Sequence, residues 1–491
     1  MATMTEKQAD TGMTTSTSGL EDGWIAQQDH DFSHQPPQDA NDPLNWPNWR
    51  KQLVLWHVSM ISFLTLFSAS LIVPTFVPLG QYLHTQITET AYVTSIYIAL
   101  VAISPLIWNP ISNVYGRRPI YFMSLATLVL FSTLSGWCKT YHTLLVLRAL
   151  TGLFGGVSLG LGNATVTDLF VERERGRYMG VYTVSFITGG HVAPIIGGYI
   201  EKRLTWRFCF YLPAILAAAL LVSFSLAVPE TLYVRRSAQD KQDQPPTGLM
   251  HFGKAHPDLH LEIADFLRPL RMLIYPSVTL PMLYYATSFG YGSILFVLTS
   301  SNLFAKLYKY KPWQTGVLLG VPLTVGSVLG EFFAGYLSDL IAERRAKTRG
   351  GLWRPEDRFI AILPGFVLTP LGIIIEGVCI SRHTHTIGPA MGIAVASFGL
   401  QIITTVVYAY TADCYRPQTA EIGAVLNFGR QVFSFCIGFH GVQLGEEIGF
   451  QSAWGVFAAI NIATGLPIAA LMVWEEQWRA RLGEPRNSRD L

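Results

Sequence analysis

The chain has 491 residues, of which 50% are hydrophobic and 14% are charged, and its net charge at pH 7 is +2. Soluble domains carry about a quarter charged residues, so this composition argues against a soluble enzyme. The nearly balanced charge gives no reason to expect a nucleic-acid partner. Five cysteines are scattered without the spacing of a metal site or a disulfide framework, and we expect no metal and no cofactor.

Apolar runs of about twenty residues recur along the chain, and each is long enough to cross a hydrocarbon core of roughly 30 Å. We therefore predict an all-α membrane protein with twelve transmembrane helices in two bundles of six. The bundles occupy residues 43–228 and 276–476, with a cytoplasmic linker at 229–275, a disordered cytoplasmic tail at 1–42 and a second tail at 477–491. The predicted spans are 53–74, 91–111, 120–137, 144–166, 178–200, 207–228, 277–300, 314–338, 359–380, 388–411, 418–441 and 453–475.

The distribution of lysine and arginine predicts how the spans are oriented, because cytoplasmic loops carry the excess of basic residues. With a cytoplasmic N-terminus, the cytoplasmic segments hold 25 lysines and arginines and the opposite side holds eight. The remaining two, Arg148 and Arg430, lie within spans. We therefore predict that both termini face the cytoplasm.

Apolar residues in the linker segment 259–273 recur near helical spacing. Such a segment fits a helix that lies along the cytoplasmic membrane surface. It fits an ordinary amphipathic connector equally well, and both interpretations stay open.

Two loops, one in each half of the chain, carry related patterns. Residues 113–119 after the second span read NVYGRRP, and residues 335–339 after the eighth span read GYLSD. A basic loop beside a carboxylate or a helix end can hold two helices together and release them when the bundles move. The alternative is that the arginines only set the topology. We predict such latches at Asn113, Gly116, Arg117 and Arg118 and at Asp339, Arg344 and Arg345.

The fifth span contains residues 189–198, which read GGHVAPIIGG, and the segment before the first span, residues 42–47, reads DPLNWP. With the two loops, these motifs resemble the major facilitator superfamily, and within it the fungal twelve-span drug:proton antiporters, from about residue 42 to 475. The resemblance implies that spans one, four, seven and ten line a central cavity, and that spans two, five, eight and eleven form the interface between the bundles. Asn113 stands where the superfamily places an aspartate, so we expect the first latch to be weaker.

The fifth-span segment resembles the antiporter motif G-x-x-x-G-P-x-x-G-G, with Ala193 in place of one glycine. Small residues let helix backbones approach closely, and proline bends a helix. Glycine-rich packing without directional meaning is the alternative. The resemblance implies an exporter's hinge at Gly189, Pro194, Gly197 and Gly198.

Ionisable residues inside spans are costly and are therefore candidates for function. Arg148, with Gly152 one turn on, resembles the superfamily's Arg-x-x-x-Gly motif, which implies a role in proton coupling; snorkelling to the outer surface is the alternative. His191 and Arg430 fall near mid-membrane, and Glu331 lies in the inner third of span eight. We expect spans eight and eleven to be neighbours, with Glu331 within reach of Arg430. His191 and Glu331 are the candidate proton carriers, although Glu331 equally fits a structural partner that neutralises Arg430.

Two acids, Glu376 and Asp413, fall at span ends, where we expect water or headgroups around them. The ionisable residues predicted near the cavity carry more positive than negative charge, which favours neutral or anionic amphipathic solutes. Four aromatic residues of span seven fit either stacking surfaces for such a solute or contacts with lipid and neighbouring helices: Tyr284, Tyr285, Phe289 and Tyr291.

These observations predict a proton-coupled secondary transporter that exports small amphipathic molecules, either xenobiotics or secondary metabolites, across the plasma membrane. The chain contains no G-x-x-x-x-G-K-[ST] segment, so we expect protons and not ATP to drive transport. One alternative is a proton-coupled importer of a polyamine or vitamin-like nutrient, and another is a non-transporting membrane sensor. We expect a monomer in the bilayer with no enzymatic activity.

A reporter fused after Leu491 tests the orientation. We expect the reporter in the cytoplasm, because the basic residues gather on that side. Protease protection in intact cells measures its location, and the same reporter inserted after Lys139 serves as the control that should be cleaved from outside. A reporter after Leu491 that is cleaved in intact cells would contradict the predicted orientation.

Overall fold

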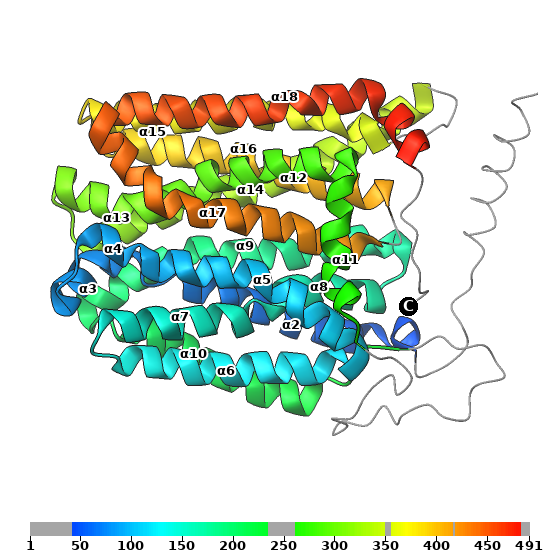
Figure 1. The fold of residues 1–491 in the computed structure, drawn as a ribbon, viewed down its shortest axis with the longest axis horizontal. Helices are drawn as coiled ribbons and strands as arrows, with labels where there is room; N and C mark the ends of the chain where they lie inside the picture. Colours follow the sequence, from blue (N-terminus) through cyan, green and yellow to red (C-terminus); the bar gives the residue numbers. More distant parts are fainter. Residues whose placement is uncertain (1–41, 234–260, 349–354, 416–417, 483–491) are drawn as a thin grey trace, which may run out of the picture.

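The computed structural model describes residues 42–233, 261–348, 355–415 and 418–482, and these residues form helices without a β-strand. The predicted tail at 1–42 therefore lies outside the described residues apart from its last residue, and so does much of the predicted linker. The long helices run side by side along one axis of the molecule (Figure 1).

Twelve helical segments of the described chain are long and apolar enough to cross a membrane, which confirms the predicted number. The first six are α2 (Asn48–Ser70) with η2 (Val73–Thr75) and α3 (Phe76–Leu83), α5 (Tyr92–Tyr115), α6 (Arg117–Trp137), α7 (Tyr141–Gly155) with α8 (Val157–Leu169), α9 (Glu172–Arg203) and α10 (Phe208–Ala227). The second six are α12 (Pro276–Phe289) with η5 (Gly290–Ile294) and α13 (Leu295–Tyr308), α14 (Pro312–Thr348), η6 (Pro355–Ile362) with α15 (Leu363–Ser381), α16 (Ile387–Cys414), α17 (Thr419–Ile448) and α18 (Phe450–Leu482). Shorter elements are η1 (Pro43–Asn45), α4 (Ile87–Thr90), α11 (Ile263–Arg271) and η4 (Met272–Ile274).

Several spans are interrupted, which sequence periodicity did not reveal. The first span continues from α2 through the short turn η2 into α3, so it runs well beyond the predicted end at residue 74. The fourth span breaks at Gly156, where an added Cβ would lie 2.8 Å from the Cβ of Ser104 on α5. The seventh span contains the π-helical turn η5. Such turns inside helices are frequent at functional sites.

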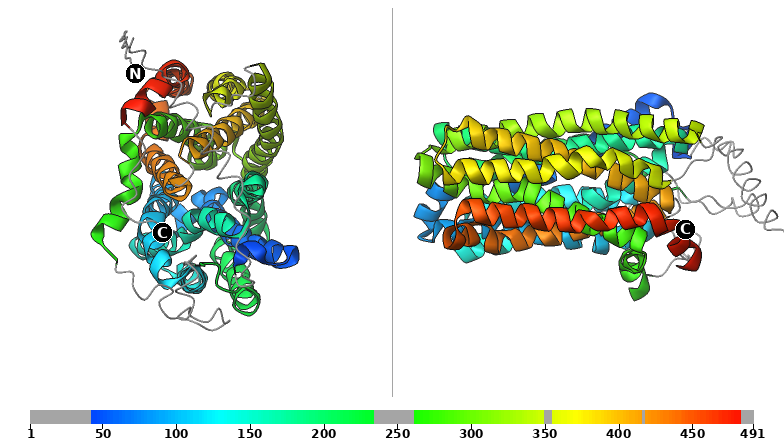
Figure 2. Two further views of the ribbon diagram at one scale, coloured as in Figure 1. Left: turned by 90° about the vertical axis from the view of Figure 1, so that its right-hand side faces the viewer. Right: turned by 90° about the horizontal axis from the view of Figure 1, so that it is seen from above.

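The spans form two groups when the molecule is viewed along the helix axes (Figure 2, left). Between the groups, α9 packs against α14 and α5 packs against α17. These contacts confirm that spans two, five, eight and eleven form the interface.

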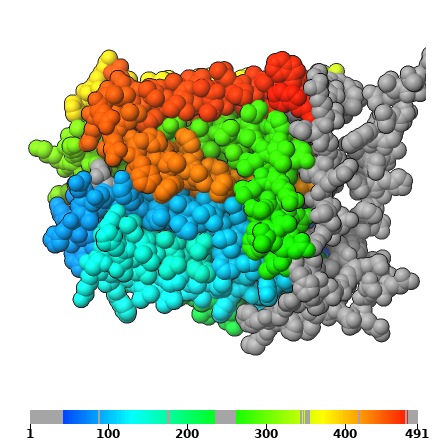
Figure 3. Space-filling view, viewed as in Figure 1, coloured from blue at the N-terminus to red at the C-terminus, as the bar shows by residue number. Residues whose placement is uncertain are grey.

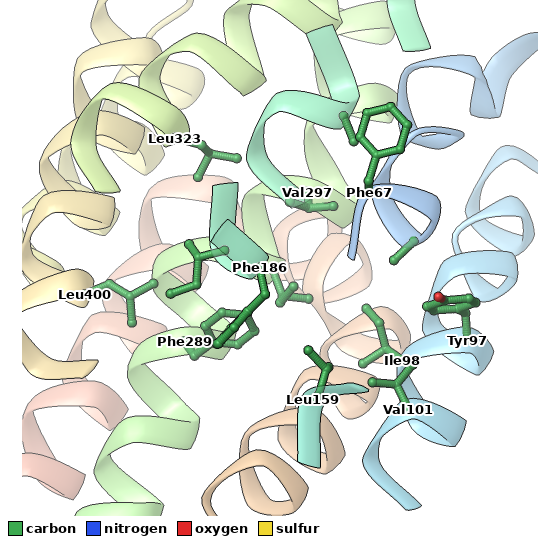
Figure 4. Close-up of a cluster of buried hydrophobic side chains, with 14 of the residues drawn as sticks. Phe67, Tyr97, Ile98, Val101, Leu159, Phe186, Phe289, Val297, Leu323 and Leu400 are labelled. Carbon is green, nitrogen blue, oxygen red and sulfur yellow. The ribbon is translucent and has the colours of Figure 1, made fainter. Parts of the chain in front are cut away.

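The bundles meet at both ends of the molecule. We call the end that carries η1 and α11 the linker end, and the end that carries α3, α4 and α13 the far end (Figure 1). The bundles are joined by α8 and α17 toward the linker end and by α3 and α13 at the far end. Between these contacts, Phe186 and Leu159 of the first bundle and Phe289 and Val297 of the second fill the centre (Figure 4).

The helix predicted in the linker is confirmed as α11. It lies across the linker end, over both bundles (Figures 1 and 3), and contacts α5 of the first bundle and α17 of the second. Arg268 lies 3.7 Å from the carboxylate of Glu421 on α17. Ile263 and Leu267 are exposed. The helix therefore connects the bundles and also carries an exposed apolar surface.

Candidate functional site

The glycine-rich segment of α9 has two packing faces, and the first of them meets α2. An added Cβ on Gly189 would lie 2.4 Å from the carbonyl oxygen of Phe63, and one on Gly197 would lie 1.9 Å from that of Leu71. A side chain at either position would push the two helices apart. Ala193 is fully buried, so its methyl group is accommodated in the place of the glycine.

The second face of this segment meets α14 of the other bundle. An added Cβ on Gly198 would lie 2.7 Å from a backbone oxygen of α14, and one on Gly316 would lie 2.2 Å from the carbonyl oxygen of Pro194. A Cβ added on Gly320 would likewise lie too close to the carbonyl oxygen of His191. Of the predicted hinge residues, Pro194 and Gly198 therefore lie where the bundles meet, whereas Gly189 and Gly197 pack against α2 of their own bundle. Sequence reasoning missed Gly316 and Gly320, although their spacing is the small-x-x-x-small pattern of closely packed membrane helices.

His191 reaches from the first bundle to the second. Its Nδ1 lies 3.1 Å from Oγ of Ser327 on α14, and its Nε2 lies 3.2 Å from Oγ of Ser293 in η5. A hydroxyl can donate or accept a hydrogen bond, so the two serines can serve the neutral and the protonated imidazole. Only 4% of His191 is exposed. Rotation of the two hydroxyls therefore lets them hydrogen-bond the imidazole in either protonation state.

Arg148 of α7 is 1% exposed. Its guanidinium donates to the carbonyls of Ser68 and Ala69 at 3.1 and 3.3 Å, and its Nε donates to the carbonyl of Val93 at 3.4 Å. The guanidinium carbon lies 4.3 Å from the ring centroid of Tyr97. These contacts hold the charge inside the first bundle, so the alternative of snorkelling to the surface does not fit.

Arg430 of α17 is 1% exposed and lies between the bundles. Its Nη1 donates to the hydroxyl of Tyr285 at 3.1 Å, and its Nη2 donates to Oδ1 of Asn427 at 2.7 Å. Its guanidinium carbon lies 4.4 Å from the ring centroid of Phe289 and 5.5 Å from that of Phe186. Because Phe186 belongs to α9, Arg430 contacts both halves of the molecule.

The expected contact between Glu331 and Arg430 is wrong. α14 packs on α9 and α16, whereas α17 packs on α5 and α12. Glu331 accepts hydrogen bonds from Gln401 at 2.5 Å and from Thr405 at 2.8 Å, both on α16. Spans eight and eleven both belong to the interface, but each packs against a helix of the opposite bundle.

The expected position of Glu376 in water or headgroups is also wrong. The residue is fully buried and accepts a hydrogen bond from Nε1 of Trp454 at 2.6 Å. α18 packs on α15 and covers this turn, which the sequence placed near the membrane surface. The aromatic residues of span seven do not face lipid, since all four are buried: Tyr284, Tyr285, Phe289 and Tyr291.

Arg117, at the start of α6, joins the linker-end termini of three helices. Its Nε lies 3.2 Å from Oδ2 of Asp168 on α8. Its Nη1 donates to Oγ of Ser112 and to Oδ1 of Asn113 on α5, each at 2.9 Å. Asp168, which sequence reasoning missed, thus supplies a carboxylate that Asn113 lacks.

The segment after span six holds the backbone of this loop. The carboxylate of Glu230 accepts from the backbone N–H groups of Arg117 and Arg118 at 2.9 and 3.1 Å, and so caps the N-terminus of α6. The guanidinium of Arg118 donates to the carbonyl of Ser225 at 2.7 Å. Gly116 has φ +96°, and a Cβ there would lie 2.5 Å from Oε2 of Glu230. Burial raises the pKa of Glu230, and the N–H donors oppose that rise.

A matching cluster lies at the linker end of the second bundle. Arg358 in η6 lies 2.6 Å from Oδ2 of Asp413 on α16, and its Nη1 donates to Oγ of Ser338 on α14 at 2.9 Å. Ser338 occupies the place in its loop that Ser112 occupies in the first. Asp413 and Asp168 each stand one residue before the last residue of their helix. Asp413, expected in water or headgroups, is thus part of an ion pair.

The two arginines predicted for the second latch differ in their surroundings, because within the described residues only Arg345 pairs with a residue of η6. Arg344 is exposed, and Arg345 lies 3.4 Å from Asp357. The side chain of Asp339 lies outside the described residues. Arg358 was missed because the connection from α14 to η6 is longer than that from α5 to α6, so spacing from the motif did not reach it.

Comparison with known families identifies the chain. Residues 58–439 match the family model described as the Major Facilitator Superfamily. The chain belongs to this superfamily. It is therefore a membrane transporter of small molecules and not an enzyme.

Similar proteins from fungi are named as transporters. The probable efflux pump mfs2 of Aspergillus flavus is 28% identical over 418 residues, which cover 83% of this chain and 97% of that protein. The MFS-type transporter penM of Penicillium rubens is 28% identical over 429 residues, covering 85% and 83%. The efflux pump radE of Floropilus chiversii is 26% identical over 439 residues, covering 87% and 80%.

Solved structures of two other transporters share the fold. A bacterial homologue of the human lysosomal transporter Spinster, in an inward-facing conformation, has a TM-score of 0.58 and 14% identity, covering 90% of this chain and 100% of that one. The peptide transporter POT has a TM-score of 0.59 and 14% identity, covering 87% and 95%.

The ion pair of Arg358 predicts that removal of this side chain changes transport, whereas removal of the exposed side chain of Arg344 does not. Hydrogen bonds to charged groups are worth about 1.5–3 kcal/mol, and Arg358→Ala removes the bonds to Asp413 and Ser338. We therefore expect this variant to transport roughly tenfold more slowly than the native chain. Arg344→Ala should behave as the native chain, because Arg344 is exposed. Transport into membrane vesicles, normalised to the amount of transporter, measures both. Equal rates for the two variants would show that Arg358 serves topology alone.

We expect Arg148 to be required for coupled transport rather than for insertion. Arg148→Ala should reach the membrane but lose proton-driven transport by roughly tenfold or more, since its bonds to α2 and α5 disappear. Arg148→Lys should restore only part of the rate, because an ammonium cannot reproduce the planar guanidinium. Surface expression and vesicle transport measure the two properties, with Lys139→Ala at the far end as the control. A native transport rate in Arg148→Ala would contradict this role.

Proposed function

We propose that this transporter exports small amphipathic organic molecules in exchange for protons across the plasma membrane, with both termini in the cytoplasm. The observation that carries the proposal is the position of residues 189–198 between α2 and α14. The segment that resembles the antiporter hinge forms the contact across which the bundles must move. Two similar fungal proteins bear the name efflux pump, which supports export as the direction.

Buried ionisable groups support coupling to protons. His191 lies between two serine hydroxyls, and Glu331 accepts from an amide and a hydroxyl. Within the described residues, neither group has an oppositely charged partner. A group of this kind changes its protonation when its surroundings alternate between dry and wet. Movement of the bundles would therefore alter the proton occupancy of both sites.

The clusters of Arg117 and Arg358 support movement of the bundles as units. Each cluster joins helices of one bundle only, so it stiffens that bundle and leaves the other free to move. Opening toward the linker end requires separation of α8 from α17, and opening toward the far end requires separation of α3 from α13. These contacts fit a rocking transporter with alternating access.

Export can be measured with a fluorescent amphipathic probe in cells that lack their own pumps. We expect cells that express this transporter to accumulate less probe, and a protonophore to abolish the difference. Probe uptake that rises with expression would contradict export and support an importer. Export that persists after the protonophore would contradict proton coupling.

A matched pair of glycine variants on α14 tests the interface itself. Gly316→Ala should lower export strongly, because a Cβ there would lie 2.2 Å from the carbonyl oxygen of Pro194. Gly335→Ala should leave export unchanged, since no atom lies within 4 Å of a Cβ at that position. Export rates at equal surface expression provide the comparison. Normal export by Gly316→Ala would contradict the role of the α9–α14 contact.

A further inference from the structure

Arg430 differs from Arg148, which is equally buried, in how its nitrogen atoms are used. In Arg148, the Nε, Nη1 and Nη2 atoms all donate to backbone carbonyls. In Arg430, only Nη1 and Nη2 have partners, and these are the neutral side chains of Tyr285 and Asn427. A guanidinium stays charged in proteins. Arg430 is therefore a buried positive charge that has no counter-charge among the described residues.

Two donors next to this charge are unpartnered. The Nε of Arg430 and the Nδ2 of Asn427 are buried and make no hydrogen bond. The two side chains are joined by the bond from Nη2 to Oδ1 at 2.7 Å, so both donors belong to one unit. A buried donor without a partner costs about 1–3 kcal/mol. An anion with two oxygen atoms would satisfy both donors and neutralise the guanidinium.

Aromatic rings surround the same guanidinium. Its carbon lies 4.4 Å from the ring centroid of Phe289, 5.5 Å from that of Phe186 and 5.8 Å from that of Tyr285. Tyr408 of α16 extends this surface, with its ring centroid 5.6 Å from that of Tyr285. Phe186 belongs to the first bundle and the other residues to the second. Separation of the bundles would therefore open the space between these rings and the guanidinium of Arg430. Aromatic faces of this kind suit a flat apolar body.

We propose that the Arg430 cluster, formed by Arg430, Asn427, Tyr285, Phe289 and Phe186, binds an anionic aromatic molecule. The acid group pairs with Arg430 and Asn427, and the ring body lies against the aromatic side chains. The proposal rests on the proposed function, in that the exported molecule is then an aromatic organic acid. An organic cation does not fit, because it would meet the uncompensated charge of Arg430.

Binding can be tested on the full-length protein in detergent with probes that share a ring body and carry head groups of different charge. The probes are 2-naphthoate, 2-naphthamide and 2-naphthylmethylammonium, and the same three head groups on anthracene. A ligand that binds the folded state raises the melting temperature. We expect the carboxylates to raise it, and the amides and ammonium compounds to raise it less or not at all. Equal shifts for the three head groups, or no shift with any probe, would overturn the proposal.

Variants then assign the charge preference to one residue. Arg430→Gln should weaken the apparent affinity for the carboxylates roughly tenfold or more, which corresponds to the loss of a charge-assisted bond. Arg430→Lys, which keeps the charge but loses the forked geometry, should lie between Arg430→Gln and the native chain. Arg382→Gln, at an exposed position, is the matched control and should bind as the native chain does. A carboxylate preference that persists in Arg430→Gln would overturn the assignment. If the glutamine variant does not fold, a carboxylate affinity of Arg430→Lys equal to the native one would overturn it instead.

Transport of the same probes into vesicles separates this proposal from the proposed function. Proton-driven movement of the ammonium probes but not the carboxylates would overturn the substrate class and leave proton-coupled export standing. Binding of carboxylates that depends on Arg430, without any gradient-driven movement, would support the site and contradict the proposed function. Proton-driven movement of the carboxylates that Arg430→Gln abolishes would support both.

Discussion

Backbone contact between α9 and α14 determines how closely the bundles approach, and contact between α9 and α2 holds α9 within its own bundle. At Gly197 and Gly316, carbonyl oxygens of the facing helices lie only 1.9 and 2.2 Å from where a Cβ would stand. Helices in lipid gain little from hydrophobic association, so close packing of this kind carries much of their attraction. The bonds from His191 to α14 and η5, and the contact of Phe186 with Arg430, exist only at this separation. The close packing at the interface therefore determines which contacts the central residues make.

The arginines at the linker end and those in the interior of the protein have different kinds of partner. Arg117 and Arg358 pair with aspartates that are partly exposed. These pairs join neighbouring helices and hold their ends in register. Inside the bundles, Arg148 and Arg430 have neutral partners only. An interior charge with neutral partners remains able to respond to a ligand or a proton, whereas a paired charge is already compensated.

The two halves repeat one construction at the linker end. In each half an arginine at the start of the third helix contacts a serine at the end of the second and an aspartate at the end of the fourth. The repeat is visible in the sequence as Ser112 and Ser338 in related loops. The cap by Glu230 follows the last helix of the first half and lies against the start of α6. Its carboxylate satisfies backbone donors that a helix cannot satisfy by itself.

The sequence by itself determined the helical fold, the number of spans and the family. Hydropathy suffices for the spans because backbone groups in lipid must bond within a helix, whatever lies beside it. The tertiary structure alone decided which side chains meet: Glu331 bonds α16 and not Arg430, Glu376 lies under α18, and Arg358 pairs with Asp413. A residue's depth can be counted along the chain. Its partners depend on the rotation of its helix and on the bundle against which that helix packs, and neither quantity is encoded in local sequence.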